Sequence, residues 1–284
     1  MRDWARYWRT ESVPVEAMHA HFTKHVYHRH SHESYSFGVT EAGAQAFTCR
    51  GASHVSGAGL VMAFNPDDPH DGHADDEDGF TYRMIHIEPG YFAGLLDGPG
   101  TLPLFRDPVI DDPALSRALL RVHAALTGGA PGLVCAERLI GAARILDRHA
   151  SRGLLTGLAG DGSRAATREI AARVRERIHD GEPTAPGGEL TIEDLAAAAG
   201  CSRYAAYRAF SSVYGMAPSD YQRQLRVRAA RGLLATGVSP ATAAAEAGFA
   251  DQPHLTRWFR RYYGVTPGAY QAATIRSAKS ALPV

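Results

Sequence analysis

The segment HVYHRHSHESYSF contains four histidines, His25, His28, His30 and His32, within a stretch of eight residues. Imidazole binds transition metals, titrates near neutral pH and both donates and accepts hydrogen bonds. The segment is therefore a candidate metal site, pH sensor or polar rim of a ligand pocket. Ten of the 14 histidines fall between His19 and His86. Which of the three kinds of site they form depends on the secondary structure elements that position them.

Length and composition are those of a soluble globular protein with one large or two medium domains. The chain has 284 residues, of which 45% are hydrophobic, and no run of 18 apolar residues that would predict a membrane span. The start, MRDWARYWRT, lacks the apolar core of a secretory signal. Three scattered cysteines, Cys49, Cys135 and Cys201, form neither a disulfide framework nor a zinc cluster. We expect a cytoplasmic protein with no membrane partner.

Charge is distributed unevenly although the net charge is zero. Residues 1–160 carry 14 Lys and Arg against 19 Asp and Glu, whereas the chain from Gly200 onward carries 11 against 3. A basic C-terminal third predicts a module that binds a polyanion, with a solvated basic face as the alternative.

The region from Glu16 to about Glu88 has the pattern of a β-structure. The expected strands are AMHAHFTKHVY, SYSFGVT, AQAFTCR, GLVMAFN and FTYRMIHIEP, with turns at EAG, RGAS, SGAG and NPDDPHDGHADDEDG. Short strands spaced by roughly ten residues favour a barrel or a sandwich. The acidic run DDPHDGHADDEDG is interpreted as a solvated loop.

Helical periodicity begins after this region. DDPALSRALLRVHAALTGG and LVCAERLIGAARILDRHA predict an antiparallel helical hairpin that packs on the barrel and pairs with a second subunit. SRGLLTGLAGDGS has the composition of a linker, and helix resumes at SRAATREIAARVRERIHD.

An internal repeat is the most informative feature of the C-terminal third. Arg208–Tyr221 and Arg257–Tyr270 share R-x-F-x-x-x-Y-G-x-x-P-x-x-Y at a constant offset of 49 residues. Before each copy, a short helix ends at a glycine, and Ser202 or Asp251 then caps a second helix. Ala196 and Ala244 precede the glycines by four residues, where two crossing helices need a small side chain. Two helix-turn-helix units with arginine in register predict DNA binding.

A single helix is expected between the two units, from Pro218 to Gly237. About nineteen residues at 1.5 Å each span roughly 28 Å, which is comparable to one turn of B-DNA at about 34 Å. Such a helix would hold two recognition helices in successive major grooves.

These motifs resemble a known family. Residues 165–275 are similar to the tandem helix-turn-helix domain of AraC/XylS-type bacterial transcription regulators through LTIEDLAAAAGCS, RVRAARGLL and GFADQPHLTRWFRRYYGVTPGAYQ. Residues 16–90 resemble the cupin-like sensor domain of that family through HRHSHESYSFGVTEAGAQ and NPDDPHDG. The resemblance implies a two-domain α+β chain, with an N-terminal cupin-like β-barrel plus helical hairpin and a C-terminal all-α tandem helix-turn-helix domain. The expected boundaries are 1–110 for the effector-sensing barrel, 111–150 for the hairpin, 151–164 for the linker, 165–275 for the DNA-binding domain and 276–284 for a tail.

The resemblance also assigns a DNA-reading set. It places Arg203, Tyr204, Tyr207 and Arg208, after the cap Ser202, on the first recognition helix, and Gln252, His254 and Arg257 on the second. Arginine can contact guanine and glutamine can contact adenine in a bidentate manner. Arg260, Arg261, Arg223, Arg226 and Arg228 are expected to contact phosphate or to remain solvated. Phe210, Phe259, Tyr221 and Tyr270 recur at helical spacing and are interpreted as core.

For the histidine segment, the resemblance leaves a metal site and a metal-free effector pocket as alternatives, and a pH switch stays open as a third because histidine titrates near pH 6.5. A cupin barrel takes metal ligands as His-x-His, a following carboxylate and a later histidine, which here fall on His30, His32, Glu41 and His70. Zn, Fe, Ni or Mn would suit that set. In the alternative no cofactor is required, and an anionic or hydroxylated effector binds the set His30, His32, Glu33, Tyr35 and His70.

The sequence as a whole favours a DNA-binding transcription regulator controlled by a small-molecule effector, and not an enzyme. Double-stranded DNA, the effector, a second copy of the chain and, for an activator, RNA polymerase are the expected partners. The alternative from another class is a metal-dependent cupin enzyme, a dioxygenase or an isomerase, fused to a DNA-binding domain.

Overall fold

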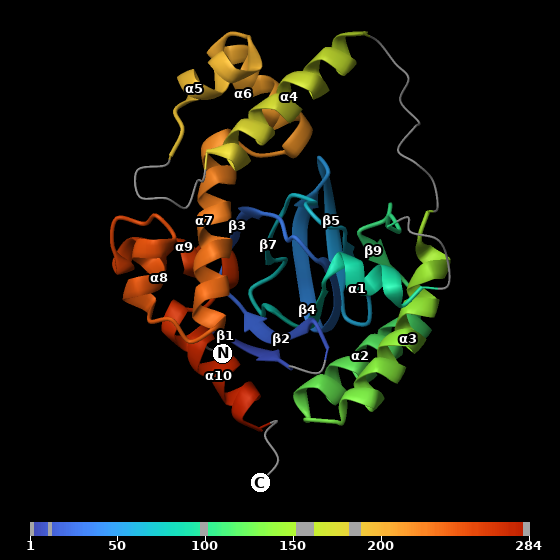
Figure 1. Cartoon of the computed structure of the whole chain (residues 1–284). Coiled ribbons are helices and arrows are strands. Elements are labelled where there is room, and N and C mark those ends of the chain that lie inside the picture. The colour runs from blue at the N-terminus through green and yellow to red at the C-terminus, as the bar shows by residue number, and fades with distance from the viewer. Residues whose placement is uncertain (1–2, 11–12, 97–101, 152–161, 182–188, 281–284) are drawn as a thin grey trace. The chain divides into compact units, whose positions relative to one another are not determined.

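A computed structural model describes residues 3–10, 13–96, 102–151, 162–181 and 189–280. The chain forms two compact units, one of residues 1–154 together with 272–284 and the other of residues 155–271. The first is rich in strands and the second is helical (Figure 1). The two-domain α+β architecture expected from the sequence is confirmed.

Among the described residues, nine strands form the sheet of the first unit: β1 (Trp4–Arg9), β2 (Val15–Phe22), β3 (Tyr27–His30), β4 (Tyr35–Cys49), β5 (Ala52–Gly57), β6 (Val61–Phe64), β7 (His70–Ala74), β8 (Phe80–Ile87) and β9 (Val109–Ile110). The main path runs β1-β2-β8-β4-β6-β9, and every pair in it is antiparallel. The second half of β4 pairs instead with β5 and β7, and β7 also pairs with β3. The strand β4 therefore belongs to both halves of the sheet and joins them.

The segment EAG, expected to be a turn, lies inside β4. The strand continues through a bulge between Thr40 and Ala42, where its pairing register with β8 shifts. Next to the bulge, Gly43 has a φ of +70°, a conformation that residues other than glycine rarely adopt. The chain thus changes partners without reversing direction, which is why the two predicted strands are one.

Alternation along the strands separates two faces of the sheet. One face carries Tyr35, Phe37 and Val39 of β4 with Ile85 and Ile87 of β8, all buried in one apolar cluster. The helices α2 (Pro113–Thr127) and α3 (Gly132–His149), an antiparallel pair in Figure 1, complete this cluster with α1 (Pro89–Gly94). The predicted helical hairpin is therefore present, and it packs on the sheet.

The other face of the sheet is lined by aromatic and polar side chains. Tyr27 and Tyr82 join their hydroxyl groups at 2.8 Å, and the Phe22 ring packs on both tyrosines. On the same face of β4, a Cβ added at Gly38 would meet Met84 of β8 at 2.8 Å. This second face is the one on which the candidate site lies.

Part of the acidic run expected to be a solvated loop is structural. Its residues His70–Ala74 form β7, and Asp71 accepts a hydrogen bond of 2.7 Å from the backbone of Thr48. Asp68 accepts from the backbone of Asn65 at 2.9 Å and pairs with Arg50. The two carboxylates accept hydrogen bonds from the backbone of neighbouring segments, so this part of the run is held against the sheet.

The helical unit contains α4 (Gly162–Asp180), α5 (Ile192–Ala199), α6 (Arg203–Tyr214), α7 (Pro218–Ala235), α8 (Pro240–Glu246), α9 (Gln252–Tyr263) and the start of α10 (Pro267–Ser280). Gly200 and Gly248 take φ values of +65° and +74° between the paired helices, as helix-turn-helix turns require. Ser202 and Asp251 accept hydrogen bonds from Ala205 and His254 at 3.2 and 2.6 Å. The predicted caps and turns are confirmed.

The recurring aromatic residues form the core of each half. Phe210 and Phe259 are fully buried, and they contact Tyr221 and Tyr270 at ring-centroid distances of 5.4 and 5.6 Å. The repeat also extends one residue beyond the motif recognised in the sequence. Gln222 bonds both backbone groups of Leu190, and Gln271 donates to the carbonyl of Val238, in each case just before the first helix of that half. These amides fasten the entry segment of each half.

The predicted linker 151–164 falls mostly on residues outside the described part of the chain, as does the end of the predicted tail 276–284. Within the described residues, the cysteines are free thiols and no helix is long and apolar enough to cross a membrane.

Candidate functional site

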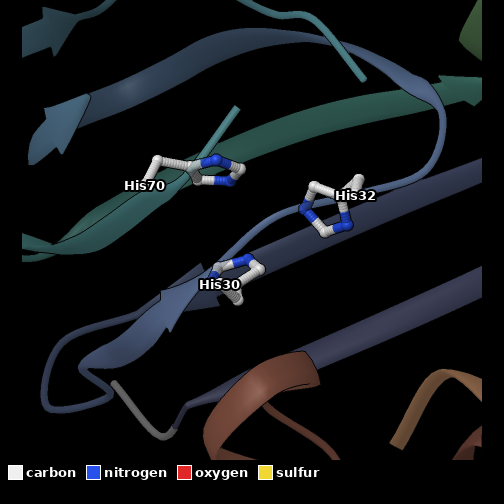
Figure 2. Close-up of side chains that lie close together, drawn as sticks. All are labelled: His30, His32 and His70. Carbon is white, nitrogen blue, oxygen red and sulfur yellow. The ribbon is translucent and has the colours of Figure 1, made fainter. Parts of the chain in front are cut away.

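Three of the predicted histidines come together on the aromatic and polar face of the sheet. One ligand nitrogen from each of His30, His32 and His70 lies within 4.8 Å of the others (Figure 2). His30 ends β3, His70 begins β7, and the two residues are cross-strand partners. His32 follows β3, past the point where strand alternation applies. His30 and His70 are buried and His32 is half-buried.

The remaining predicted ligands lie elsewhere. Glu41 faces the helix side of the sheet, where it accepts a 2.7 Å hydrogen bond from Arg83 and lies 2.8 Å from His19. Tyr35 is buried in the helix-side core and donates to the carbonyl of Pro103 at 2.7 Å. Glu33 is exposed in the bend before β4. Of the residues predicted for the metal set and the effector set, the structure therefore brings together His30, His32 and His70, and it places Glu33, Tyr35 and Glu41 elsewhere.

A fourth histidine, which the sequence reasoning missed, adjoins the cluster. The ring of His86 lies 4.8 Å from that of His32, and its Nδ1 is 2.8 Å from the hydroxyl of Ser36. Ser36 and His86 are opposite each other in the β4–β8 register. The alternation of FTYRMIHI places His86 on the face of Tyr82 and Met84, which is the signal that would have identified it.

A second polar network lies on the helix side of the sheet. The guanidinium of Arg83 donates to Glu41 and, at 3.2 Å, to Nδ1 of His123 in α2, while His123 Nε2 donates to the carbonyl of Met18 at 3.0 Å. Burial, together with the positive charge of Arg83, lowers the pKa of His123 to about 4. The network joins α2 to three strands through a neutral imidazole.

This neutral histidine predicts acid sensitivity. Unfolded His123 binds a proton near its ordinary pKa of about 6.5, whereas the folded form stays neutral down to about 4. Between these two pKa values the unfolded state binds more protons than the folded state. The free energy of unfolding therefore decreases as the pH is lowered, by about 2 kcal/mol from pH 7 to pH 5. Urea unfolding at both pH values should show this loss. His123→Gln, which keeps a donor and an acceptor, should lack that share of the pH dependence; an unchanged dependence would exclude His123 as its source.

The predicted reading residues of α6 form an exposed face. Tyr204 and Tyr207 are 69% and 49% exposed, although large aromatic side chains are usually covered. The guanidinium of Arg208 lies 5.3 Å from the ring centroid of Tyr204, and Arg203 pairs with Glu193 of α5 at 2.6 Å. Ser202 caps the helix. The opposite side, with Ala206 and Phe210, is buried.

The second helix presents a similar face with one exception. Gln252, Arg257 and Arg260 of α9 are exposed. His254 is half-buried, and its Nε2 accepts a 3.1 Å hydrogen bond from the indole of Trp258. Because the indole N–H only donates, the neutral His254 ring carries its proton on Nδ1. Towards DNA, the ring can therefore act only as a hydrogen-bond donor, through Nδ1.

Two linker arginines differ from the expectation of phosphate contact or solvation. Arg226 is 7% exposed, pairs with Glu189 at 2.8 Å and donates to the carbonyl of Gly248. Arg223 pairs with Asp220 and lies 4.0 Å from the ring centroid of Trp258. Both side chains therefore support α7 against its neighbours.

Comparison with known families matches each unit separately. Residues 12–156 match the AraC-like ligand binding domain, and residues 195–273 match a helix-turn-helix domain. The first match alone covers half of the chain and contains the whole histidine cluster.

Individual relatives agree with this assignment. YbfI of Bacillus subtilis (strain 168), an uncharacterized HTH-type transcriptional regulator, is 28% identical over 229 residues, which is 80% of each chain. The transcriptional activator NphR of a Rhodococcus species is 35% identical over 123 residues, 43% of this chain and 34% of NphR. A crystal structure of ToxT from Vibrio cholerae with a bound unsaturated fatty acid has the same fold, with a TM-score of 0.53 at 12% identity over 98% of this chain and 99% of ToxT. The chain belongs to the AraC family of transcription regulators, with a ligand-binding domain followed by a DNA-binding helix-turn-helix domain.

Proposed function

We propose that the exposed faces of α6 and α9 read two half-sites of an operator in successive major grooves, and that an effector bound by the first unit sets operator affinity. The observation that supports the proposal most is the recurrence of Arg208 and Arg257, 49 residues apart, at the same exposed position of two capped helices. Packing of the buried core does not select arginine at an exposed position, so the recurrence favours a binding role. On this proposal Arg260 and Arg261 contact phosphate.

The connecting helix α7 sets the spacing of the half-sites. Its 18 residues form one uninterrupted helix, whose length of about 27 Å approaches one turn of B-DNA. The buried Arg226 pairs with Glu189, before α5, and donates to the carbonyl of Gly248, between α8 and α9, so it links segments of both halves to this helix. Two recognition helices in one chain then contact the same side of the duplex.

We further propose that the effector is a small hydroxylated or carboxylate-bearing molecule. The face that holds the histidines also offers the hydroxyl groups of Tyr27 and Tyr82 and the imidazole of His86. Effector binding changes transcription only when the two states of the regulator bind the effector with different affinity.

The wider setting of the regulator is part of the same proposal. We propose that it binds its effector without converting it, acts in the cytoplasm where the operator lies, and forms a homodimer through α2 and α3. Leu133 at the start of α3 is 81% exposed, which suits a subunit contact. As an activator it would also contact RNA polymerase. The alternative metal-dependent enzyme loses its predicted carboxylate, because Glu41 pairs with Arg83 on the opposite face.

The spacing argument makes a direct prediction. Selection from randomised duplexes with the full chain should yield two conserved half-sites about 10 base pairs apart. Inserting five base pairs between them rotates one half-site to the opposite side, and the affinity should fall to that of a single half-site. Fluorescence anisotropy at fixed salt measures this change. Selection of only one half-site, or full tolerance of the insertion, would contradict the proposed arrangement of α6 and α9.

A further inference from the structure

The three-histidine cluster has a defined protonation pattern. His30 Nδ1 lies 2.7 Å from the carbonyl oxygen of His28, and His70 Nδ1 lies 2.8 Å from that of Asp68. A carbonyl oxygen only accepts, so each Nδ1 donates, and the neutral ring must carry its lone pair on Nε2. The two rings therefore present basic nitrogens, not N–H groups, to the site.

Backbone carbonyls that bind Nδ1 are the usual outer partners of metal-binding histidines. They orient the ring and increase the basicity of the nitrogen that binds the metal. Here they are joined by a second restraint, because the His70 ring stacks on Phe64 with a centroid distance of 4.0 Å and an interplanar angle of 3°. His30 is fixed opposite His70 by the pairing of β3 with β7. Two of the three nitrogens are thus held in place before any ligand binds.

The third histidine lies outside the strands. His32 is half-buried and follows the end of β3, with its ring centroid 4.9 Å from that of His30 and 5.2 Å from that of His70. Ligand nitrogens about 2.1 Å from a tetrahedral zinc ion lie about 3.4 Å apart. The ligand atoms lie within 4.8 Å of one another, so the separation between them would contract by an amount of the order of 1 Å when the metal binds.

We propose that His30, His32 and His70 bind one divalent transition-metal ion inside the ligand-binding domain (Figure 2). Three imidazoles select zinc, nickel, copper or ferrous iron over magnesium and calcium, which prefer oxygen ligands. Manganese, also expected from the sequence, loses its preferred carboxylate because Glu41 lies on the other face.

Three protein ligands leave one position of a tetrahedral ion open. An oxygen atom of a hydroxylated or carboxylate-bearing effector fits that position, and this part of the inference rests on the proposed function. The metal would then make the effector site selective for molecules with an oxygen donor, next to the ring of Tyr27, whose centroid lies 5.6 Å from that of His30.

Titration of tag-free full-length protein with Co²⁺, followed by ligand-field absorption and elemental analysis, tests the site. Wild type should bind close to one ion per chain, displaced by Zn²⁺. His32→Asn and His70→Asn should each weaken binding more than about 100-fold, because loss of an outer partner alone costs about 10- to 100-fold. His73→Ala is the matched control, because His73 is exposed on β7, and it should bind like wild type.

The outcomes are separable. If wild type binds no more Co²⁺ than the His30→Ala/His32→Ala double variant, the metal site is refuted and the histidines are hydrogen-bonding groups of a metal-free pocket. If a variant fails to fold, the stoichiometry of wild type and its displacement by Zn²⁺ still decide. Metal binding is measured without DNA, so the absence of metal binding does not contradict the proposed DNA-binding function. Conversely, failure to select an operator does not contradict a metal site that has been measured by titration.

Discussion

Replacing Arg208 and Arg257 together by alanine is expected to lower operator affinity by up to about 10⁴-fold. Each arginine that makes a bidentate contact to guanine contributes about 1–3 kcal/mol of discrimination, roughly 10- to 100-fold for a single variant. The two positions lie on separate helices, so their contributions should be nearly additive. Both side chains are exposed, and folding should be unaffected.

The control must separate base reading from loss of charge. Arg173→Ala in α4 removes the same charge from a side chain that is 53% exposed and lies outside both recognition helices. It should leave discrimination between operator and random duplex unchanged. If Arg208→Ala and Arg257→Ala weaken operator and random duplex equally, with a smaller salt dependence, the two arginines are phosphate contacts and the assignment of the reading face is wrong.

Gly43→Ala is expected to destabilise the ligand-binding domain by more than about 4 kcal/mol. At this bulge the backbone has φ +70°, and a Cβ would lie 1.9 Å from the carbonyl oxygen of Gly79. The obstructing atom belongs to the backbone of the adjoining segment, so no side-chain rotation relieves the overlap. Relief requires β4 and β8 to separate where they pair, and urea unfolding of the full chain measures the cost.

Gly51→Ala is the matched control for this change. Gly51 also has a positive φ, +82°, but no atom of the described part of the chain lies within 4 Å of the added Cβ. Only the conformational penalty of about 1–2 kcal/mol applies there. Equal losses for the two variants would mean that the bulge accommodates a methyl group and that the close approach of β4 to Gly79 does not hold the fold together.

The DNA-binding half was predictable because its signals are local. Caps, turn glycines and the aromatic core recur within a few residues of one another, so Ser202, Gly200 and Phe210 follow from short-range rules of helix geometry. The offset of 49 residues then supplied a second, independent copy. The fate of Arg226 did not follow from these rules, because its burial depends on Glu189 and Gly248, which lie far from it along the chain.

In the sheet domain, the residues themselves indicated β-structure and a histidine site, and only the tertiary structure decided which side chains share it. A side chain's face depends on strand register, and a single bulge or a missed strand transfers it to the opposite side. Tyr35 and Glu41 therefore face the helices, whereas His86, opposite Ser36, joins the histidine cluster. His30 and His70, 40 positions apart, meet because β3 pairs with β7, a contact between distant segments that no local pattern encodes.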